Sequence, residues 1–307
     1  MKMTIDILIL GAGWCSTFMI PLCDEKSITY AATSRSGRDT TIKFVFNADS
    51  DDPEPYTVLP NARTILITFP IDKKGASERL VRLYSQSRGE GGDVKPRFIQ
   101  LGTTNMWGGS RLTRGQNAQG ADAAVQSGWY DRRSPYAPTP RAEEEAALLA
   151  LSPATPTTVL NLAGLWGGSR SPKNWVAKIA PSKEALRAKG SLHLIHGLDV
   201  ARCVLAVHSD FAKAQGQRWV LTDGRVYDWW DLASAWGSSP VPTTEESSSN
   251  LSSSEDRGPQ AMWIRELMDE AGVRALPRNV ELLGRALDSR EFWTTFGLTP
   301  IKARVEV

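Results

Sequence analysis

Apolar residues in the first half of the chain follow two alternating patterns. Short continuous runs, such as the β-branched run TILITF at residues 64–69, predict buried strands. Between these runs, apolar residues recur three or four positions apart, as at Leu80, Leu83 and Tyr84, which predicts helices with one buried face. Because strands and helices alternate along the chain, we expect an α/β fold with a doubly wound parallel sheet.

The same two patterns assign most of the chain to particular elements. A proline in the middle of a helix costs about 3 kcal/mol, so Pro21 favours a first helix that begins late, near Thr17. Strands are expected at residues 5–10, 28–32, 43–46, 64–69, 97–101, 157–162 and 219–222, and helices at residues 16–24, 77–87, 141–151, 182–189, 200–208, 261–271 and 280–287.

After residue 167 the alternation of strand and helix patterns becomes less regular, which suggests a second, smaller structural unit. We expect residues 1–170 to form the sheet domain, with the sheet completed by about residues 193–225. Residues 171–192 and 226–307 are expected to form a small C-terminal lobe over the strand ends, where it would bind substrate. Within this lobe, residues 238–259 are rich in Ser, Pro and Glu and nearly free of large apolar side chains, so they predict a mobile loop.

Composition and charge narrow the possible partners. The chain has 307 residues, and 36 basic against 34 acidic residues leave a net charge of +2, which gives no electrostatic basis for binding nucleic acid or an anionic membrane. No apolar run reaches the roughly 18 residues of a membrane-spanning helix, and the apolar N-terminal run ends in a glycine turn rather than a cleavage site. We therefore expect a cytoplasmic protein.

The number and spacing of the cysteines and histidines predict neither a disulfide framework nor a metal site. The three cysteines, Cys15, Cys23 and Cys203, are odd in number and widely spaced, which argues against a disulfide framework. The histidines have no acidic or thiol side chains clustered with them, so no metal site is expected.

A glycine-rich turn follows the first predicted strand, in the segment GAGWCS at residues 11–16. Gly11 permits a tight turn, Gly13 lets the backbone approach a pyrophosphate, and Ser16 is small enough for the helix to pack closely on the strand. The helix N-terminus would then face the phosphate with free N–H groups. This strand–turn–helix unit predicts a dinucleotide-binding Rossmann domain; the alternative is a plain turn that needs a positive φ.

The end of the second predicted strand selects the cofactor. An acidic residue there would bind the ribose 2′-hydroxyl of NAD, but the chain has Ser34 and Arg35, with Arg38 close by. The planar guanidinium of Arg35 suits a 2′-phosphate, so we expect NADP(H) with Ser34 and Arg35 in its site. The alternative is a solvated loop arginine.

Four later segments resemble the short-chain dehydrogenase/reductase superfamily, in particular its extended and atypical branch near the sugar-nucleotide epimerases and dehydratases. The resemblance covers nearly the whole chain. Its segments are FIQLGTTNMWG at residues 98–108, TVLNLAGLWG at 158–167, HLIHGLDVARCVLAV at 193–207 and SREFWTTFGLTP at 289–300.

The resemblance implies roles for individual residues. Thr103 falls on the catalytic Ser/Thr position, and His196 matches a histidine of the third segment. His193 lies where sugar-nucleotide enzymes carry a substrate-binding arginine. The cofactor site is expected to contain Gly11, Gly13, Trp14, Cys15, Ser16, Ser34, Arg35, Thr68, Thr103 and Ala163.

The helix after Thr103 departs from the family pattern. The family places a Tyr-x-x-x-Lys pair there, in which the lysine lowers the tyrosine pKa and holds the nicotinamide ribose. Here Tyr136 is followed four positions later by Pro140, and the helix start carries Arg141. The departure indicates an atypical member in which the cofactor site persists while the chemistry is altered or absent.

Several side chains remain candidates for chemistry. Thr103 and Thr104 could donate a hydrogen bond to a substrate carbonyl, although a strand-end threonine can equally contact only backbone or cofactor. Tyr136, or Tyr130, could supply a proton, against a packing or lid role. His193 and His196 could act as acid, base or phosphate contact, and for His196 a structural role in holding a turn is favoured.

The chain contains 11 tryptophans, and those outside the predicted strand cores could line an apolar substrate pocket. Such a pocket would suit a hydrophobic or aromatic carbonyl compound. Against this, Trp229, Trp230 and Trp236 are expected to pack the C-terminal lobe.

These observations leave three functions open. The first is an NADP(H)-dependent oxidoreductase of the atypical short-chain type that acts on a small organic carbonyl or alcohol. The second is a non-catalytic NADP(H)-binding redox sensor, favoured by the missing Tyr-Lys pair. The third is a nucleotide-sugar epimerase or dehydratase, against which the missing pair and the absence of an arginine at position 193 both argue. A homodimer is expected from the resemblance.

Overall fold

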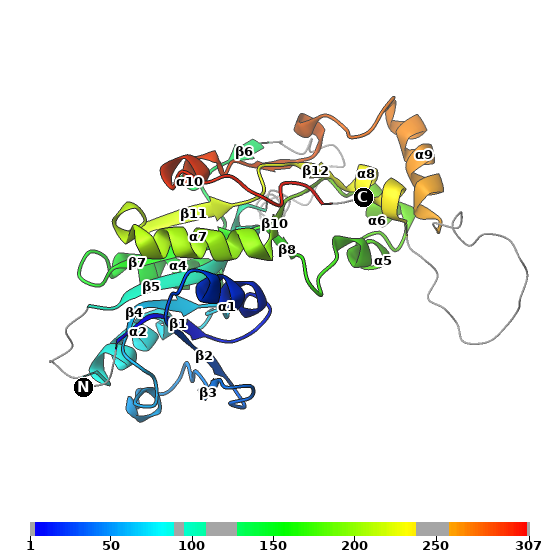
Figure 1. Ribbon diagram of the computed structural model, residues 1–307. Helices are drawn as coiled ribbons and strands as arrows, with labels where there is room; N and C mark the ends of the chain where they lie inside the picture. Colours follow the sequence, from blue (N-terminus) through cyan, green and yellow to red (C-terminus); the bar gives the residue numbers. More distant parts are fainter. Residues whose placement is uncertain (1–3, 89–94, 109–127, 238–257, 306–307) are drawn as a thin grey trace, which may run out of the picture.

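The apolar runs form the strands of one parallel sheet. The computed structural model describes residues 4–88, 95–108, 128–237 and 258–305. Among these, seven strands lie in the order β11-β7-β5-β4-β1-β2-β3, and each neighbouring pair is parallel (Figure 1). The strands are β1 (Ile5–Leu10), β2 (Tyr30–Ser34), β3 (Ile42–Lys43), β4 (Ala62–Ile67), β5 (Arg97–Thr103), β7 (Thr157–Leu162) and β11 (Gln217–Leu221).

Strand order reverses between β1 and β4. From β1 the chain proceeds outward to β2 and β3, and it then returns to β4 and proceeds outward the other way through β5, β7 and β11. Loops that follow β1 and β4 therefore diverge, which opens a crevice at the carboxyl ends of these strands. The doubly wound α/β fold expected from the sequence is confirmed.

Helices cover both faces of the sheet. Helices α1 (Ser16–Glu25) and α7 (Gly197–Ser209) contact each other on one face, and α2 (Ala76–Gln86) and α4 (Pro140–Ala150) contact each other on the other (Figure 1). Along β1, alternate side chains enter the two cores: Ile9 joins the cluster under α1 and α7, whereas Leu8 joins the cluster under α2 and α4.

A separate hydrophobic cluster lies outside the sheet. It contains the buried Trp229, Trp230, Ile264 and Leu267, and Trp230 Nε1 donates to the Leu186 carbonyl at 2.9 Å. The prediction that Trp229 and Trp230 pack the later part of the chain is confirmed. The helices of this part are α5 (Val176–Ile179), α6 (Lys183–Arg187), α8 (Trp229–Trp236) and α9 (Gln260–Ala271).

The C-terminal segment returns to the sheet. In α10 (Arg290–Thr295), Phe292 and Trp293 belong to the core under α1 and α7, and the Phe292 ring lies 5.6 Å from that of Trp219 on β11. The segment from 290 therefore packs on the sheet core, although residues 226–307 were assigned to the lobe. The expected boundaries elsewhere remain predictions, and residues 238–257 of the expected mobile loop lie outside the described residues.

Short strand pairs and single turns complete the described fold. The pairs are β6 (Gly128–Tyr130) with β13 (Arg285–Leu287), β8 (Gly164–Trp166) with β10 (Leu194–His196), and β9 (Ser191–Leu192) with β12 (Tyr227–Asp228). The 3₁₀ turns are η1 (Glu54–Tyr56), η2 (Thr104–Trp107), η3 (Pro172–Trp175), η4 (Phe211–Lys213) and η5 (Val280–Leu282).

Two expectations of local structure were wrong. The helix expected at 280–287 is one 3₁₀ turn followed by β13, because Gly284 adopts a left-handed φ of 80° and the next residues pair with β6. The first helix forms as expected for residues 16–24, but it does not begin late: it starts at Ser16, and Pro21 lies inside it. Pro21 and Thr17 are both exposed, so the Thr17 carbonyl that loses its helical partner can be hydrated.

Candidate functional site

The glycine-rich turn has the geometry that its two glycines predict. Gly11 has φ of 95°, and a Cβ at this position would lie 2.7 Å from Thr68 Oγ1. A Cβ on Gly13 would meet nothing within 4 Å, so this face of the turn is open. Gly11 is therefore needed by the protein's own packing, whereas Gly13 leaves space for a ligand.

Neighbouring strand ends hold the turn in place. The Gly11 amide donates to Thr33 Oγ1 at 3.0 Å, and the Ala12 amide donates to the Thr33 carbonyl at 2.6 Å. From the other side, Thr68 Oγ1 donates to the Gly11 carbonyl at 2.7 Å. Ser16 Oγ donates to the Gly13 carbonyl at 2.5 Å, so its hydroxyl also serves the turn.

The start of α1 leaves backbone donors unused. No side chain caps this helix, and within the described part of the chain the amides of Trp14 and Cys15 have no acceptor. Two unpaired N–H groups beside the open face of Gly13 fit the oxygens of a phosphate. This arrangement meets the requirement for the pyrophosphate of a dinucleotide.

The segment after β2 presents two arginines. Ser34 Oγ accepts the Gly37 amide at 2.9 Å and the Arg38 amide at 3.2 Å, which fixes a tight loop. Arg35 is exposed at the start of this loop and forms no ion pair with the described residues. Arg38 lies near Asp39, at 3.9 Å on the surface. The structure therefore keeps Arg35 accessible at the position predicted to bind a 2′-phosphate.

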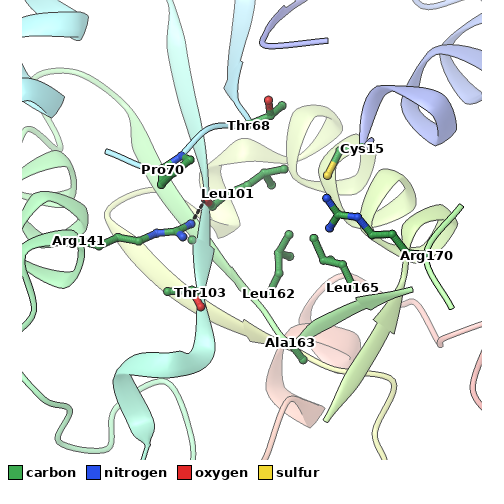
Figure 2. A pocket seen from close by; sticks show the side chains of 11 residues that line it. Cys15, Thr68, Pro70, Leu101, Thr103, Arg141, Leu162, Ala163, Leu165 and Arg170 are labelled. Atoms are coloured by element: carbon green, nitrogen blue, oxygen red, sulfur yellow. Dashed lines mark hydrogen bonds between the residues drawn. The ribbon is translucent and has the colours of Figure 1, made fainter. Parts of the chain in front are cut away.

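A cavity of about 330 Å³ lies at the carboxyl ends of the central strands (Figure 2). Four of the predicted site residues line it, namely Cys15, Thr68, Thr103 and Ala163. Sequence reasoning missed the other lining residues, which are Pro70, Leu101, Gly102, Arg141, Leu162, Leu165 and Arg170.

The charge of the cavity wall has one sign. Arg141 and Arg170 lie on opposite sides in Figure 2, and none of the described lining residues is acidic. Burial raises the pKa of Cys15 to about 11, so this thiol is neutral at physiological pH. The cavity thus combines aliphatic walls with two permanent cations, which suits an anionic ligand.

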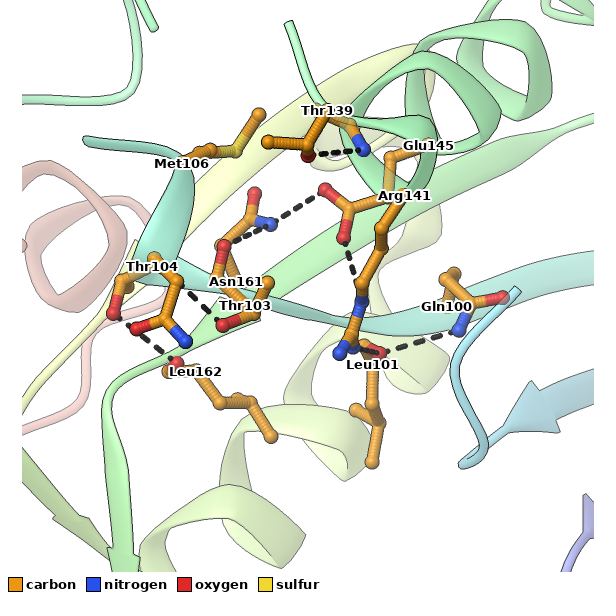
Figure 3. A network of polar contacts seen from close by, with 12 residues as sticks. Gln100, Leu101, Thr103, Thr104, Met106, Thr139, Arg141, Glu145, Asn161 and Leu162 are labelled. Carbon is orange, nitrogen blue, oxygen red and sulfur yellow. Dashed lines mark hydrogen bonds and ion pairs between the residues drawn. The ribbon is translucent and has the colours of Figure 1, made fainter. Parts of the chain in front are cut away.

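Arg141 is held at the cavity by a buried polar network (Figure 3). Its Nη2 donates to the Leu101 carbonyl at 2.8 Å, and its Nε lies 3.4 Å from Glu145 Oε1. Glu145 Oε2 accepts from Asn161 Nδ2 at 2.7 Å and from Arg218 Nη1 at 2.9 Å. One buried carboxylate therefore serves two guanidinium groups.

Gly102 allows this network to approach β5. A Cβ there would lie 2.4 Å from Asn161 Nδ2 and 2.7 Å from Glu145 Oε1. Both neighbours are buried and hydrogen-bonded, so neither can move away cheaply.

Thr103 lines the cavity and carries a hydroxyl. Its Oγ1 accepts the Asn105 amide at 3.2 Å, and this bond leaves the hydroxyl proton available for a ligand. Thr104 is different: its side chain is buried and donates to the Leu162 carbonyl at 3.3 Å. Of these two candidates, only Thr103 lines the cavity.

The other candidate acids lie away from the cavity lining. The Tyr136 ring lies 6.2 Å from that of Trp107 and 4.7 Å from the Arg218 guanidinium carbon. His193 is buried and its Nε2 accepts the Leu287 amide at 3.0 Å; burial, aided by the charge of Arg285, lowers its pKa to about 3. Catalytic roles for Tyr136 and His193 stay predictions, without support from their positions.

His196 has a structural position. Its Nδ1 accepts the Leu198 amide at 3.1 Å at the start of α7, and burial lowers its pKa. The Trp166 ring lies 4.6 Å away from the His196 ring. No tryptophan lines the cavity as described, so aliphatic rather than aromatic side chains form its apolar wall.

The described residues contain neither a membrane-spanning helix nor a metal-binding cluster. No helix there is long and apolar enough to cross a membrane. Within the same residues, no group of three or more His, Cys, Asp or Glu side chains is placed to bind a metal.

This chain is similar to known proteins in its structure but not in its sequence. No family model matches the sequence, and no curated protein matches it. Among solved structures, the chain is similar to UDP-N-acetylglucosamine 4-epimerase from Bacillus cereus, with TM-score 0.55 and 9% identity over 97% of this chain and 94% of that one. It is also similar to yeast methylglyoxal/isovaleraldehyde reductase Gre2 complexed with NADPH, with TM-score 0.56 and 14% identity over 97% and 93% of the two chains.

A third similar structure is a short-chain dehydrogenase/reductase superfamily protein from Agrobacterium tumefaciens with bound NAD, with TM-score 0.55 and 11% identity over 97% and 92%. All three similarities extend over nearly the whole of both chains. The chain therefore has the fold that these three proteins share.

Proposed function

We propose that this chain binds NADP(H) along the carboxyl ends of its central strands and acts as an oxidoreductase on a small organic carbonyl or alcohol. One observation carries the proposal: the same cavity is lined by Cys15, beside the unpaired amides of the glycine-rich turn, and by Thr103. A cofactor bound there would place its phosphates at the turn and its reactive ring beside Thr103.

The choice of cofactor rests on two kinds of support. Similar structures contain NADPH in one case and NAD in another, which supports a nicotinamide cofactor without choosing between them. Arg35, exposed and unpaired with the described carboxylates, favours the 2′-phosphate of NADP(H).

Residues at the far end of the cavity take distinct roles. NADPH, when bound, supplies the hydride. Arg141 donates hydrogen bonds to the hydroxyls of the nicotinamide ribose, in place of the lysine that the family carries on this helix. Thr103 donates to the substrate oxygen and stabilises the charge that develops on it, and water supplies the proton that completes the alcohol, because no described lining residue titrates near neutral pH. Leu162 keeps bulk water from the reacting carbon.

A specific observation keeps a second function open. No tyrosine, lysine or histidine is among the described lining residues, and an arginine does not release a proton near neutral pH. A cavity without a titrating acid is the expected property of a non-catalytic NADP(H) sensor, which binds the cofactor and reports its redox state to a partner.

Turnover distinguishes the two functions. NADPH binding is measured by its fluorescence, and oxidation is then followed at the nicotinamide absorbance band with aldehydes, ketones and quinones. For an oxidoreductase we expect turnover of at least one compound, and Thr103→Val should abolish turnover while it leaves NADPH binding intact. Thr104→Val is the matched control, because Thr104 faces the protein interior. Binding without turnover across the panel would support the sensor.

A further inference from the structure

Arg170 is fixed in a tight hairpin after β8. The Gly167 amide donates to the Arg170 carbonyl at 2.9 Å, and the Arg170 amide donates to the Gly167 carbonyl at 3.1 Å. Gly167 and Gly168 supply the left-handed φ angles of 105° and 56° that this turn needs. A Cβ on Gly167 would lie 2.2 Å from His196 Nε2, so the hairpin packs closely on the body of the protein.

The hairpin is fastened to the glycine-rich turn through Trp14. The Trp14 Nε1 donates to the Gly167 carbonyl at 3.0 Å, across 153 positions of sequence. The Arg170 guanidinium carbon lies 4.6 Å from the centre of the Trp14 ring, in cation–π contact. Phe18 supports the indole from α1, with ring centres 5.0 Å apart.

Arg170 lines the cavity, and its side chain is also exposed to solvent. It lies on the same side of the cavity as Cys15, the residue that precedes α1 (Figure 2). Its positive charge opposes the effect of burial on the pKa of Cys15, which agrees with this proximity. Within the described chain, no carboxylate forms an ion pair with Arg170.

We propose that Arg170 binds the pyrophosphate of the dinucleotide beside the glycine-rich turn, and that the Trp14 side chain positions Arg170 rather than contacting the cofactor itself. The proposal rests on the proposed binding of NADP(H). A planar guanidinium matches two phosphate oxygens at once, and the amides of Trp14 and Cys15 can meet the others. The pyrophosphate would then contact both the Arg170 guanidinium and the N-terminus of α1.

This site can be tested separately from the rest of the cofactor site. Calorimetry compares NADPH with adenosine 2′-monophosphate, which has the 2′-phosphate but no pyrophosphate, on the full chain. Arg170→Gln should weaken NADPH by about tenfold or more and leave adenosine 2′-monophosphate unchanged. Arg290→Gln is the matched control for net charge, because Arg290 is exposed, lies outside the cavity lining and pairs with Asp288.

Three other outcomes would each overturn the proposed role of Arg170. Unchanged NADPH affinity in Arg170→Gln would overturn the proposal and leave NADP(H) binding intact. Equal weakening of both ligands would also overturn it, because the effect would then be general. If the parent protein binds no NADPH at all, the proposed function fails first and this inference with it.

The role of Trp14 needs a double-mutant cycle. If Trp14 acts by holding Arg170, Arg170→Gln should add little further loss of NADPH affinity once Trp14→Leu is present. Fully additive losses would show that Trp14 acts independently of Arg170. Thermal melts of each variant confirm that the effects arise in folded protein.

Discussion

Arg141 and Glu145 lie one helical turn apart on α4, with Arg141 Nε 3.4 Å from Glu145 Oε1, and this pair places a guanidinium at the wall of the cavity. Glu145 also pairs with Arg218, so two cations share one buried carboxylate. The pair therefore links the stability of α4 on the sheet to the position of a cation that faces the ligand.

Glu145→Gln should be strongly destabilising. The substitution leaves the buried Arg218 without a countercharge, and removing one partner of a buried pair costs about 3 kcal/mol or more. Urea unfolding measures the loss. Glu143→Gln, on the exposed face of the same helix, is the control and should change stability little. Equal stability of the two variants would contradict the network as described.

Alanine substitutions should separate the two glycines of the turn. Gly13→Ala should fold with nearly unchanged stability, because the added Cβ meets no protein atom within 4 Å, yet it should weaken NADPH binding by filling the phosphate's space. Gly11→Ala should lose stability, because its φ of 95° and the contact with Thr68 both oppose a side chain. Melting temperatures and NADPH titrations check both. Unimpaired NADPH binding by Gly13→Ala would place the phosphate elsewhere.

Charge reversal at Arg35 should alter cofactor preference. Arg35→Asp replaces a partner of the 2′-phosphate with a repulsive carboxylate, so NADPH affinity should fall by at least about tenfold, while NADH affinity changes little. Arg63→Asp, at a surface arginine near Asp6, controls for net charge. Equal weakening of NADPH and NADH would remove Arg35 from the site.

Asp223 should make stability depend on pH. Burial raises its pKa to about 7, although the Tyr227 hydroxyl donates to it at 2.6 Å. Since this pKa is raised on folding, the folded state binds more protons between pH values of about 4 and 7, and the free energy of unfolding falls as pH rises through that window.

Asp223→Asn removes this titration. Relative to the parent, the variant should gain stability between pH values of about 5 and 8, by about 3 kcal/mol at most. Melting temperatures of both proteins at the two pH values give the comparison. A constant difference between them would contradict the raised pKa.

The sequence could predict the sheet and the glycine-rich turn because both depend on local patterns. β1 and β7 occupy the residues expected from their apolar runs, and Gly11 adopts the positive φ that its turn requires. The prediction of a helix at 280–287 was wrong because the pairing of these residues with β6, which is distant in sequence, outweighed the helical spacing of their apolar side chains.

The cavity's two arginines could not be assigned in the same way. Arg141 stood at the start of a predicted helix and Arg170 in a glycine-rich loop, and an arginine in either setting is usually solvated. Their convergence depends on how α4 and the hairpin after β8 pack across the sheet, which no local pattern contains. One signal was present: Arg141 and Glu145 have the spacing of a helical ion pair.

Calorimetric titration of the full chain with NADPH and with NADH tests the central claim most directly. We expect one saturable site that binds NADPH more tightly than NADH and is weakened by Gly13→Ala. No heat with either nucleotide at about 1 mM would contradict the account.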